Sequence, residues 1–211
     1  AAHDIHAGTV PEYPGSKEFK FVQVKSEDKA FDLIKGLTQK LYSTRQQFQV
    51  LSPRHKGTVG VTNLNEHLRE LLNPKQPGIR EVRIGREVLR ENDRVMVVRN
   101  DYELEVFNGD TGKIARFEQR DREVEIKVHG PPITHIRMPY AKVPSLLRMA
   151  YAITVHKSQG MEYDTIVIPL VDSFRSQLQR NLIYTAITRA KKRVIILGTR
   201  SALRKACLLY T

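Results

Sequence analysis

Apolar positions in the first third of the chain recur alternately at strand spacing and at helix spacing. The run 19–24 (FKFVQV) has the pattern of a strand, 27–42 repeats apolar residues at helical intervals, and 48–53 is a buried-strand pattern closed by a proline. Leucines in 63–74 fall on one helical face, with Asn63 as the expected N-cap. This alternation predicts βαβ units and therefore a parallel sheet.

The pattern changes between residues 82 and 143. Short β-rich runs follow one another there, separated by Asn-Gly-Asp, Gln-Arg-Asp-Arg and Gly-Pro-Pro turn signals. Val124, Ile126 and Val128 alternate with charged residues, so one face of that strand is buried and the other is wet. Four or five such strands predict a small antiparallel barrel inserted into the α/β domain.

Helix and strand patterns alternate again after Pro144. Apolar residues recur at i, i+3, i+4 and i+7, at Leu146, Met149, Ala150 and Ile153. This spacing predicts an amphipathic helix that ends at Gly160. Next come the pattern of a central parallel strand (165–170), a helical run (176–192) and a final strand (193–198).

Charge favours a polyanionic partner. The 211 residues include 35 Lys and Arg against 23 Asp and Glu, a formal charge of +12 with a pI near 9.9. The net charge is +2 for residues 1–74, +3 for 75–150 and +7 for 151–211. Nucleic acid and anionic membrane surfaces both fit such an excess, and a purely solubilising role is the simpler alternative.

Other features narrow the class of protein. No apolar run approaches the roughly 20 residues needed to cross a bilayer, so we expect no membrane segment. The single Cys207 excludes an internal disulfide and favours a reducing compartment, the cytoplasm. The seven His residues lack partners at zinc spacing, so no metal site is predicted.

Two motifs in the C-terminal third resemble those of a known family. The segment 153–164 (ITVHKSQGMEYD) resembles motif V of superfamily 1 helicases, and 181–198 (NLIYTAITRAKKRVIILG) resembles their motif VI. Within that superfamily, 50–74 is similar to the motif IV region of RecD-type helicases and 100–114 to their strand-rich insert. Even 1–11 resembles the segment that follows their first motor domain, so the resemblance covers nearly the whole chain.

The resemblance implies a fold and a division into domains. The expected architecture is α/β: a RecA-like parallel sheet flanked by helices, a second motor domain without its own Walker A loop, with an inserted small SH3-like β-barrel. The sheet would be formed by 1–81 and 144–211, and the barrel by 82–143.

The chain lacks the phosphate-binding parts of a motor. No G-x-x-x-x-G-K-[ST] loop occurs, and no acidic strand end is recognisable for Mg²⁺. The family carries both in its N-terminal RecA-like domain. We therefore expect this sequence to be the C-terminal half of a larger helicase, inactive alone, with ATP and Mg²⁺ as cofactors only alongside that domain.

Arg189 is the candidate catalytic residue. Phosphoryl transfer spreads charge over the γ-phosphate, which a guanidinium supplied from a second domain can stabilise. In the context YTAITRA, Arg189 resembles such an arginine finger. The alternative is an arginine that interacts with the negative end of a helix dipole.

The resemblance also implies ligand-binding residues around motif V. The expected DNA contacts are Thr154, Val155, His156, Lys157 and Ser158. The expected nucleotide contacts, besides Arg189, are Gln159, Gly160, Glu162 and Lys56. Arg54 stands where the family commonly has Met, so whether Arg54 or Lys56 takes the phosphate-facing role of that loop stays open. Ser158 could equally cap only backbone groups, and His156 and Lys157 could form a solvated helix end.

The barrel is expected to line a DNA channel. It carries cations among acidic neighbours: Arg94, Arg99, Lys113, Arg116 and Lys127. Asn100, Tyr102 and Phe107 are available for stacking or phosphate contacts. On general grounds, however, Tyr102 and Phe107 are expected more often in a core than on a surface.

Two functions follow as expectations. The first is the C-terminal motor and single-stranded-DNA-binding portion of an ATP-dependent 5′-to-3′ DNA helicase in recombination or repair. Its partners would be single-stranded DNA, its own N-terminal RecA-like domain and, in recombination complexes, nuclease subunits of RecB and RecC type, with no membrane. The alternative is a free-standing, non-enzymatic nucleic-acid-binding module. RNA in place of DNA is a minor variant, since backbone contacts alone do not distinguish them.

Overall fold

The chain forms two compact units. The computed structural model describes residues 18–130, 132–174 and 177–208, so the family-like segment 1–11 lies outside the described residues. Of the described residues, those up to Leu72 and from Ala152 onward form the sheet unit, and those within Asn73–Tyr151 form the barrel unit. The barrel unit thus begins before 82 and ends after 143, the boundaries expected from the sequence.

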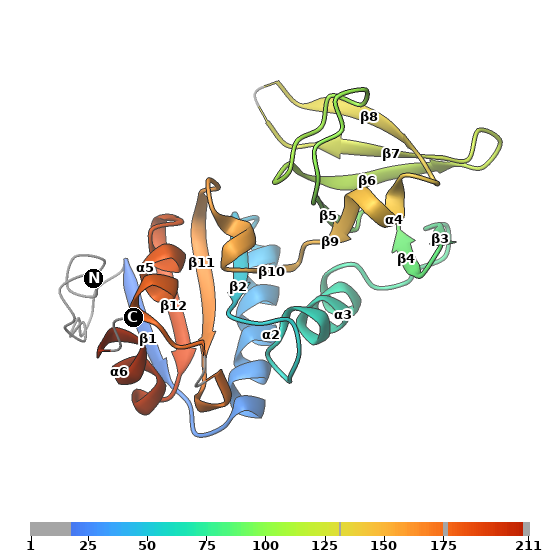
Figure 1. Cartoon of the computed structure of the whole chain (residues 1–211). Coiled ribbons are helices and arrows are strands. Elements are labelled where there is room, and N and C mark those ends of the chain that lie inside the picture. The colour runs from blue at the N-terminus through green and yellow to red at the C-terminus, as the bar shows by residue number, and fades with distance from the viewer. Residues whose placement is uncertain (1–17, 131, 175–176, 209–211) are drawn as a thin grey trace. The chain divides into compact units, whose positions relative to one another are not determined.

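A five-stranded parallel sheet forms the centre of the sheet unit (Figure 1). Its order is β1-β12-β11-β2-β10, with β1 Phe19–Gln23, β12 Ala190–Gly198, β11 Tyr163–Leu170, β2 Phe48–Ser52 and β10 Ala152–Thr154. All five residues of β2 are buried, as a central strand requires. We call the end of the sheet where the strands finish its carboxyl edge, and the other end its amino edge.

Helices cover both faces of this sheet (Figure 1). In the described part of the sheet unit the helices are α2 Glu27–Ser43, α3 Val61–Leu72, α5 Arg180–Ile187 and α6 Arg200–Leu208. The connection from β1 to β2 through α2 crosses the sheet in the opposite direction to that from β11 to β12 through α5. Because parallel crossovers are right-handed, α2 and α5 lie on opposite faces. The predicted RecA-like arrangement of a parallel sheet between helices is confirmed.

The sequence determines α2 locally. Ser26 caps the helix by accepting a hydrogen bond from the Lys29 amide at 3.2 Å, and Glu27 and Asp28 occupy the first turn, where the helix dipole favours acids. One apolar face is buried, including Ala30 and Ile34. The predicted helix over 27–42 is therefore confirmed.

Three local predictions are wrong. The expected helix from Pro144 to Gly160 is instead a helical turn α4 (Val143–Leu146), two short strands, β9 (Leu147–Met149) and β10, and a 3-10 turn η1 (His156–Ser158). The helical spacing does not reflect a helix, because the four residues belong to different elements: Leu146 ends α4, Met149 ends β9, Ala150 lies between the two strands and Ile153 lies in β10. Asn63 lies inside α3, which begins at Val61, rather than capping it.

The third error concerns the expected helix 176–192. The helix α5 ends at Ile187, and β12 begins three residues later at Ala190, because the following residues pair with β11. Arg189 therefore lies beyond the helix. The first residue of the expected helix falls outside the described residues.

The barrel unit consists of two antiparallel sheets around one core. Five strands run in the order β8-β7-β6-β5-β9, with β8 Thr134–Pro139, β7 Glu123–Val128, β6 Thr111–Glu118 and β5 Arg94–Val97; β3 Glu81–Ile84 and β4 Glu87–Arg90 form a hairpin. Ile84 and Leu89 of the hairpin join Ile114, Phe117 and Val124 in the same hydrophobic cluster. The predicted alternation in β7 is confirmed, since Val124 and Ile126 are buried.

A buried network joins the two ends of the barrel unit. The Asp93 carboxylate accepts hydrogen bonds from the Asn73 amide at 2.9 Å, the Arg90 backbone at 2.7 Å and the Tyr151 hydroxyl at 3.0 Å. Burial and the Asp93 charge raise the pKa of Tyr151. Because Asn73 begins the unit and Tyr151 ends it, one carboxylate fixes both ends. Among the described residues, no helix is long and apolar enough to cross a membrane.

Candidate nucleotide and nucleic-acid interface

The motif V segment begins at the carboxyl edge of the parallel sheet. Thr154, the last residue of β10, is level with Ser52 at the end of β2. The buried Asn65 side chain of α3 donates to the Ala152 carbonyl and accepts from the Ala152 amide, both at 2.9 Å. These two hydrogen bonds satisfy the backbone amide and carbonyl of Ala152, as a neighbouring strand would. They therefore fix where the motif V segment starts.

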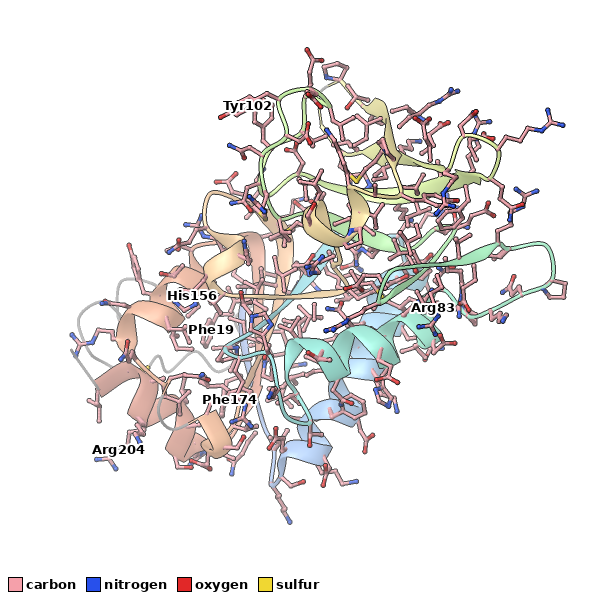
Figure 2. The ribbon with its side chains drawn as sticks, turned by 45° about the vertical axis from the view of Figure 1, so that its right-hand side comes forward. Phe19, Arg83, Tyr102, His156, Phe174 and Arg204 are labelled. Carbon is pink, nitrogen blue, oxygen red and sulfur yellow. The ribbon has the colours of Figure 1, made fainter. Side chains whose placement is uncertain are left out.

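Two hydroxyl groups shape the turn that follows. The Thr154 hydroxyl accepts from the Lys157 amide at 3.3 Å, and the Ser158 hydroxyl donates to the Val155 carbonyl at 2.7 Å. Thr154, Val155 and Ser158 are buried, whereas His156 and Lys157 are exposed (Figure 2 labels His156). Of the five expected DNA contacts, therefore, only His156 and Lys157 present side chains to solvent.

The second half of the segment returns to the amino edge. Tyr163, near its end, pairs with Ala190 at the start of β12. Gly160 has φ +81°, a left-handed conformation that favours glycine, and both Gln159 and Gly160 are exposed. The Glu162 carboxylate lies 3.1 Å from the Lys191 ammonium; both side chains are more than half exposed, so this pair adds little stability.

Arg189 lies beside this returning half. Its guanidinium donates from Nε to the Thr185 carbonyl at 3.2 Å, from Nη1 to the Met161 carbonyl at 3.4 Å and from Nη2 to the Thr188 hydroxyl at 3.2 Å. All three acceptors are neutral, and within the described residues no carboxylate pairs with it. The bond to Thr185, in the last turn of α5, agrees with the helix-end alternative. The uncompensated charge also suits an incoming anion.

Arg54 is engaged in packing, and Lys56 is exposed. The Arg54 guanidinium lies 4.9 Å from the centre of the Phe174 ring and donates to the Ser173 carbonyl at 3.1 Å. Gly57 passes so close that a Cβ there would lie 2.5 Å from Arg54 Nη2. The loop that carries both cations follows the carboxyl end of β2, whereas Arg189 precedes β12 at the amino edge, about 20 Å away at 3.3 Å per strand residue. The structure therefore does not bring Lys56 together with Arg189.

The 98–110 loop of the barrel unit presents two aromatic rings to solvent. Tyr102 is 76% exposed and Phe107 50% exposed, with their ring centres 6.3 Å apart (Figure 2 labels Tyr102). The general expectation that both belong to the core is wrong. The loop is braced from within, since Asn100 accepts from the Asn108 amide at 2.8 Å and the Lys142 ammonium lies 2.7 Å from Asp101. A braced loop can hold exposed rings without burying them.

Strand register gathers cations on the outer face of the barrel unit. Arg94 lies opposite Lys113 and Lys113 opposite Lys127, across β5, β6 and β7. His129 follows two residues after Lys127, on the same face. We call these four residues the cationic row: Arg94, Lys113, Lys127 and His129. Their neighbours in sequence, such as Ile114 and Ile126, face the core.

Burial and mutual repulsion lower the pKa values of two members of the cationic row. The pKa of Lys113 is lowered by burial and by the charges of Arg94 and Lys127. The pKa of His129 is lowered by burial and by the charges of Arg94, Lys113 and Lys127. Arg116, by contrast, pairs with Glu118 at 2.8 Å and Glu125 at 2.9 Å. The sequence does not reveal the row, because composition alone cannot fix which strands pair.

The described residues offer no evident metal centre. No group of three or more His, Cys, Asp or Glu side chains is placed to hold an ion in the part of the chain that the structure describes. The fold and this geometry define the class: a RecA-like domain of motor type with an inserted antiparallel unit, bearing cations on both.

Comparison with known proteins defines the family. Residues 64–128 match the model of the ATP-dependent RecD-like DNA helicase SH3 domain, and 149–197 match the UvrD-like helicase C-terminal domain. The chain is 33% identical over 202 residues to the ATP-dependent RecD2 DNA helicase of Deinococcus radiodurans, covering 96% of this chain and 27% of that protein. It is 30% identical over 173 residues to the RecBCD enzyme subunit RecD of Mycobacterium tuberculosis, covering 81% of this chain and 28% of the relative.

Solved structures agree on the fold. A Pif1 helicase in a study of DNA unwinding at forked double-stranded DNA matches with TM-score 0.53 at 17% identity, over 90% of this chain and 50% of that one. Bacteroides Pif1 bound to single-stranded DNA also gives 0.53, at 16% identity, over 90% and 52%. The chain belongs to the RecD-type superfamily 1 helicases, as their C-terminal region. It spans under a third of the length of these curated relatives.

Proposed function

We propose that this chain is the second motor domain and DNA-contacting barrel of an ATP-dependent 5′-to-3′ DNA helicase that acts in recombination or repair. One observation carries the proposal: the segment 154–162 runs from the carboxyl edge of the sheet, at Thr154, to Arg189 at the amino edge. A single short segment thus connects a candidate DNA contact with a candidate nucleotide contact. A displacement of the segment at the nucleotide contact would therefore be transmitted to the DNA contact.

Arg189 would act as the finger. Its guanidinium carries a charge that no described carboxylate neutralises, and its three hydrogen bonds are 3.2–3.4 Å long, so each is readily exchanged. Gln159 and Gly160, exposed nearby, would contact the same nucleotide. A γ-phosphate bound by a phosphate loop in the N-terminal motor domain would be the acceptor. ATP and Mg²⁺ would be held there, with this chain supplying the stabilising charge.

The DNA contacts would come from both units. His156 and Lys157 would meet phosphates from the sheet unit. Tyr102 and Phe107 would stack on bases, and the cationic row would follow the phosphate chain of single-stranded DNA. Expected partners are therefore single-stranded DNA, the N-terminal motor domain and, for a member of a recombination complex, nuclease subunits of RecB and RecC type.

The test compares the 211-residue chain with the full-length protein. Steady-state ATP hydrolysis is measured for each with and without single-stranded DNA. We expect DNA-stimulated hydrolysis only from the full-length protein. Turnover by the 211-residue chain itself would contradict the proposal, and a full-length protein that binds DNA without hydrolysing ATP would favour the binding-module alternative.

A further inference from the structure

The two exposed aromatic rings of the 98–110 loop stand next to a short backbone bridge. Asp101 and Val106 form this isolated antiparallel bridge, in which each amide donates to the carbonyl of the other residue, at 2.9 and 3.0 Å. Tyr102 follows one member of the bridge and Phe107 follows the other. Because Val106 is buried in the core of the barrel unit, one side of the bridge is anchored there. The position of the rings therefore depends on how Asp101, on the other side, is held.

The Asp101 carboxylate is held from outside the loop by Lys142. One carboxylate oxygen accepts a hydrogen bond from the Leu104 amide at 3.1 Å, which closes the turn between the bridged residues. The other oxygen accepts from the Lys142 ammonium at 2.7 Å, and the Asp101 side chain is only 15% exposed. The same ammonium donates to the Glu103 carboxylate, also at 2.7 Å, but that side chain is 85% exposed. Asp101 is therefore the main partner of Lys142.

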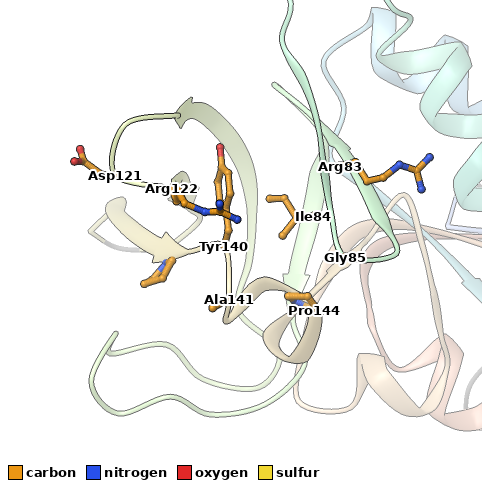
Figure 3. A pocket seen from close by; sticks show the side chains of 9 residues that line it. Arg83, Ile84, Gly85, Asp121, Arg122, Tyr140, Ala141 and Pro144 are labelled. Atoms are coloured by element: carbon orange, nitrogen blue, oxygen red, sulfur yellow. The ribbon is translucent and has the colours of Figure 1, made fainter.

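Lys142 projects from a turn that is itself firmly held. Its carbonyl accepts hydrogen bonds from the Leu146 amide at 3.1 Å and from the Ser145 hydroxyl at 2.9 Å, at the start of α4. Pro144 packs against Gly85 in the β3–β4 turn, where an added Cβ would lie 3.2 Å from the proline ring, and both residues line a cavity of about 490 Å³ (Figure 3). Lys142 therefore ties the loop to a well-packed part of the barrel unit.

Hydrogen bonding keeps both groups of this contact charged. The hydrogen bond from Lys142 lowers the pKa of Asp101, and the hydrogen bonds to Asp101 and Glu103 raise the pKa of Lys142. The contact is therefore an ion pair at neutral pH. Because two carboxylates already engage the Lys142 ammonium, it is less available to a phosphate than Lys127 of the cationic row, which lies among other cations.

We propose that Lys142 is a positioning residue for single-stranded DNA. Through Asp101 it holds the turn that keeps the rings of Tyr102 and Phe107 in place for stacking on bases. The inference rests on the stacking role proposed above for these rings, and it deepens that role. A loop whose geometry is fixed before binding loses less conformational freedom when DNA binds, so the same contacts give a higher affinity. Lys142 itself touches no nucleotide.

The first experiment measures the motion of the loop without DNA. The chain contains no tryptophan, so Tyr102→Trp introduces a single fluorescent reporter next to the bridge. Time-resolved fluorescence anisotropy follows its motion on the nanosecond timescale. We expect Lys142→Met and Asp101→Asn to increase the amplitude of this motion, since each breaks the ion pair. Lys142→Arg should keep the normal amplitude, because a guanidinium can still donate to the carboxylates.

The second experiment measures how tightly the 211-residue chain binds a labelled oligothymidylate of about 12 nucleotides, in about 0.15 M salt. Tyr102→Ala and Phe107→Ala should each weaken binding at least about fivefold, as loss of base stacking does. Lys142→Met should weaken it about two- to tenfold, because the freed loop must be ordered on binding. In a chain that already lacks both rings, Lys142→Met should have no further effect, since it acts through them.

A matched pair of charge changes separates positioning from electrostatics. Asp101→Asn keeps an oxygen for the Leu104 amide and removes only the charge that Lys142 engages. Glu105→Gln removes the same charge from an exposed side chain of the same turn, which forms no ion pair within the described residues. If charge alone mattered, both variants would bind the polyanion more tightly. Positioning predicts that Asp101→Asn binds about two- to tenfold more weakly, whereas Glu105→Gln stays within about twofold of normal because salt screens its charge.

Two results would overturn this inference alone. One is that Lys142→Met and Asp101→Asn, shown to be folded by circular dichroism, leave either the motion of the reporter or the DNA affinity unchanged. The other is that Asp101→Asn binds DNA more tightly than the normal chain, as charge alone predicts for it and for Glu105→Gln. Normal affinity in both Tyr102→Ala and Phe107→Ala would instead overturn the proposed stacking role and this inference with it, so the two failures are distinguishable.

Discussion

Arg189 Nη1 donates a hydrogen bond to the Met161 carbonyl oxygen at 3.4 Å, joining the end of α5 to the motif V segment. At this length the bond is weak, and the acceptor is neutral. A phosphate oxygen would be a stronger acceptor for the same guanidinium. Exchange of one for the other would release Met161 and its neighbours Gly160 and Glu162, which gives a physical link between nucleotide state and the segment that begins at Thr154.

Replacement of Arg189 by Ala in the full-length protein should abolish hydrolysis while leaving nucleotide binding nearly intact. Arginine fingers contribute about 10³–10⁵ in turnover, and the phosphate loop that binds the nucleotide would be unaffected. Arg189→Lys should recover little, because an ammonium lacks the planar fork. The measurement is steady-state ATPase rate at saturating single-stranded DNA, with nucleotide affinity determined separately.

Lys192→Ala is the matched control for that experiment. Lys192 lies three residues further on and pairs with Asp164 at 2.7 Å on the exposed surface, so its loss should change turnover by less than about twofold. Circular dichroism establishes that both variants are folded. If Arg189→Ala keeps more than about a tenth of normal turnover, the lost stabilisation is under about 1.4 kcal/mol and the helix-end interpretation applies.

Neutralising the cationic row should weaken binding of single-stranded DNA and reduce its dependence on salt. Each lost phosphate contact lowers the slope of log affinity against log salt by about 0.7. We expect a decrease in slope of about this size for Lys127→Gln and a further decrease of the same size when Lys113→Gln is added. Titrations of the 211-residue chain with a labelled oligonucleotide at several salt concentrations measure the slope. Arg116→Gln serves as control, since Glu118 and Glu125 already pair with the Arg116 charge. If Arg116→Gln changes the slope as much as Lys127→Gln does, the cationic row has no specific role in DNA binding.

Binding of single-stranded DNA should strengthen as the pH falls from about 7.5 to 5.5. The pKa of His129 is lowered by burial and neighbouring cations, so protonation of this imidazole is disfavoured in the free protein. A bound polyanion raises that pKa, and binding therefore takes up a proton. The difference between the pH dependence of normal and His129→Asn protein, at constant salt, isolates the effect. If the two proteins show the same pH dependence of DNA binding, the His129 imidazole does not take up the proton.

The free protein should respond to pH in the opposite sense. Because His129 has a lowered pKa when folded, the unfolded chain binds more protons as the pH falls through about 6.5. The contribution of neutral His129 to the free energy of unfolding is therefore present above about pH 6.5 and is lost as the pH falls below it. Urea denaturation of the normal protein and His129→Asn at pH 7.5 and 5.5 measures the difference, which should shrink in the variant.

Removing the hydroxyl group from each of two tyrosines of the barrel unit should affect the free energy of unfolding differently. Tyr151→Phe removes a donor from the buried Asp93 carboxylate and should lower the free energy of unfolding by about 1–3 kcal/mol. Tyr140→Phe removes a buried hydroxyl that has no partner among the described residues and should be neutral or stabilising. Urea denaturation of both variants checks the pair. A Tyr140→Phe protein as unstable as Tyr151→Phe would mean that the Tyr140 hydroxyl has an acceptor.

The sequence by itself determined the elements whose signals are local. Ser26 caps α2 and two acids follow it in the first turn, and the buried runs of β2 and β11 are continuous enough to identify central strands. Motif resemblance likewise depends only on the order of residues, and it predicted the family that the comparisons confirm. Such features need no partner from elsewhere in the chain.

Only the tertiary structure decided which surfaces come together. The apolar residues between Pro144 and Gly160 fit a helical period, yet Met149 in β9 and Ile153 in β10 belong to separate sheets, because backbone pairing with β5 and β2 outweighs local preference. The cationic row exists only through the register of β5, β6 and β7, and Arg189 meets Met161 only because β11 and β12 begin side by side. Pairings between distant residues are absent from local periodicity, and they set the geometry on which function depends.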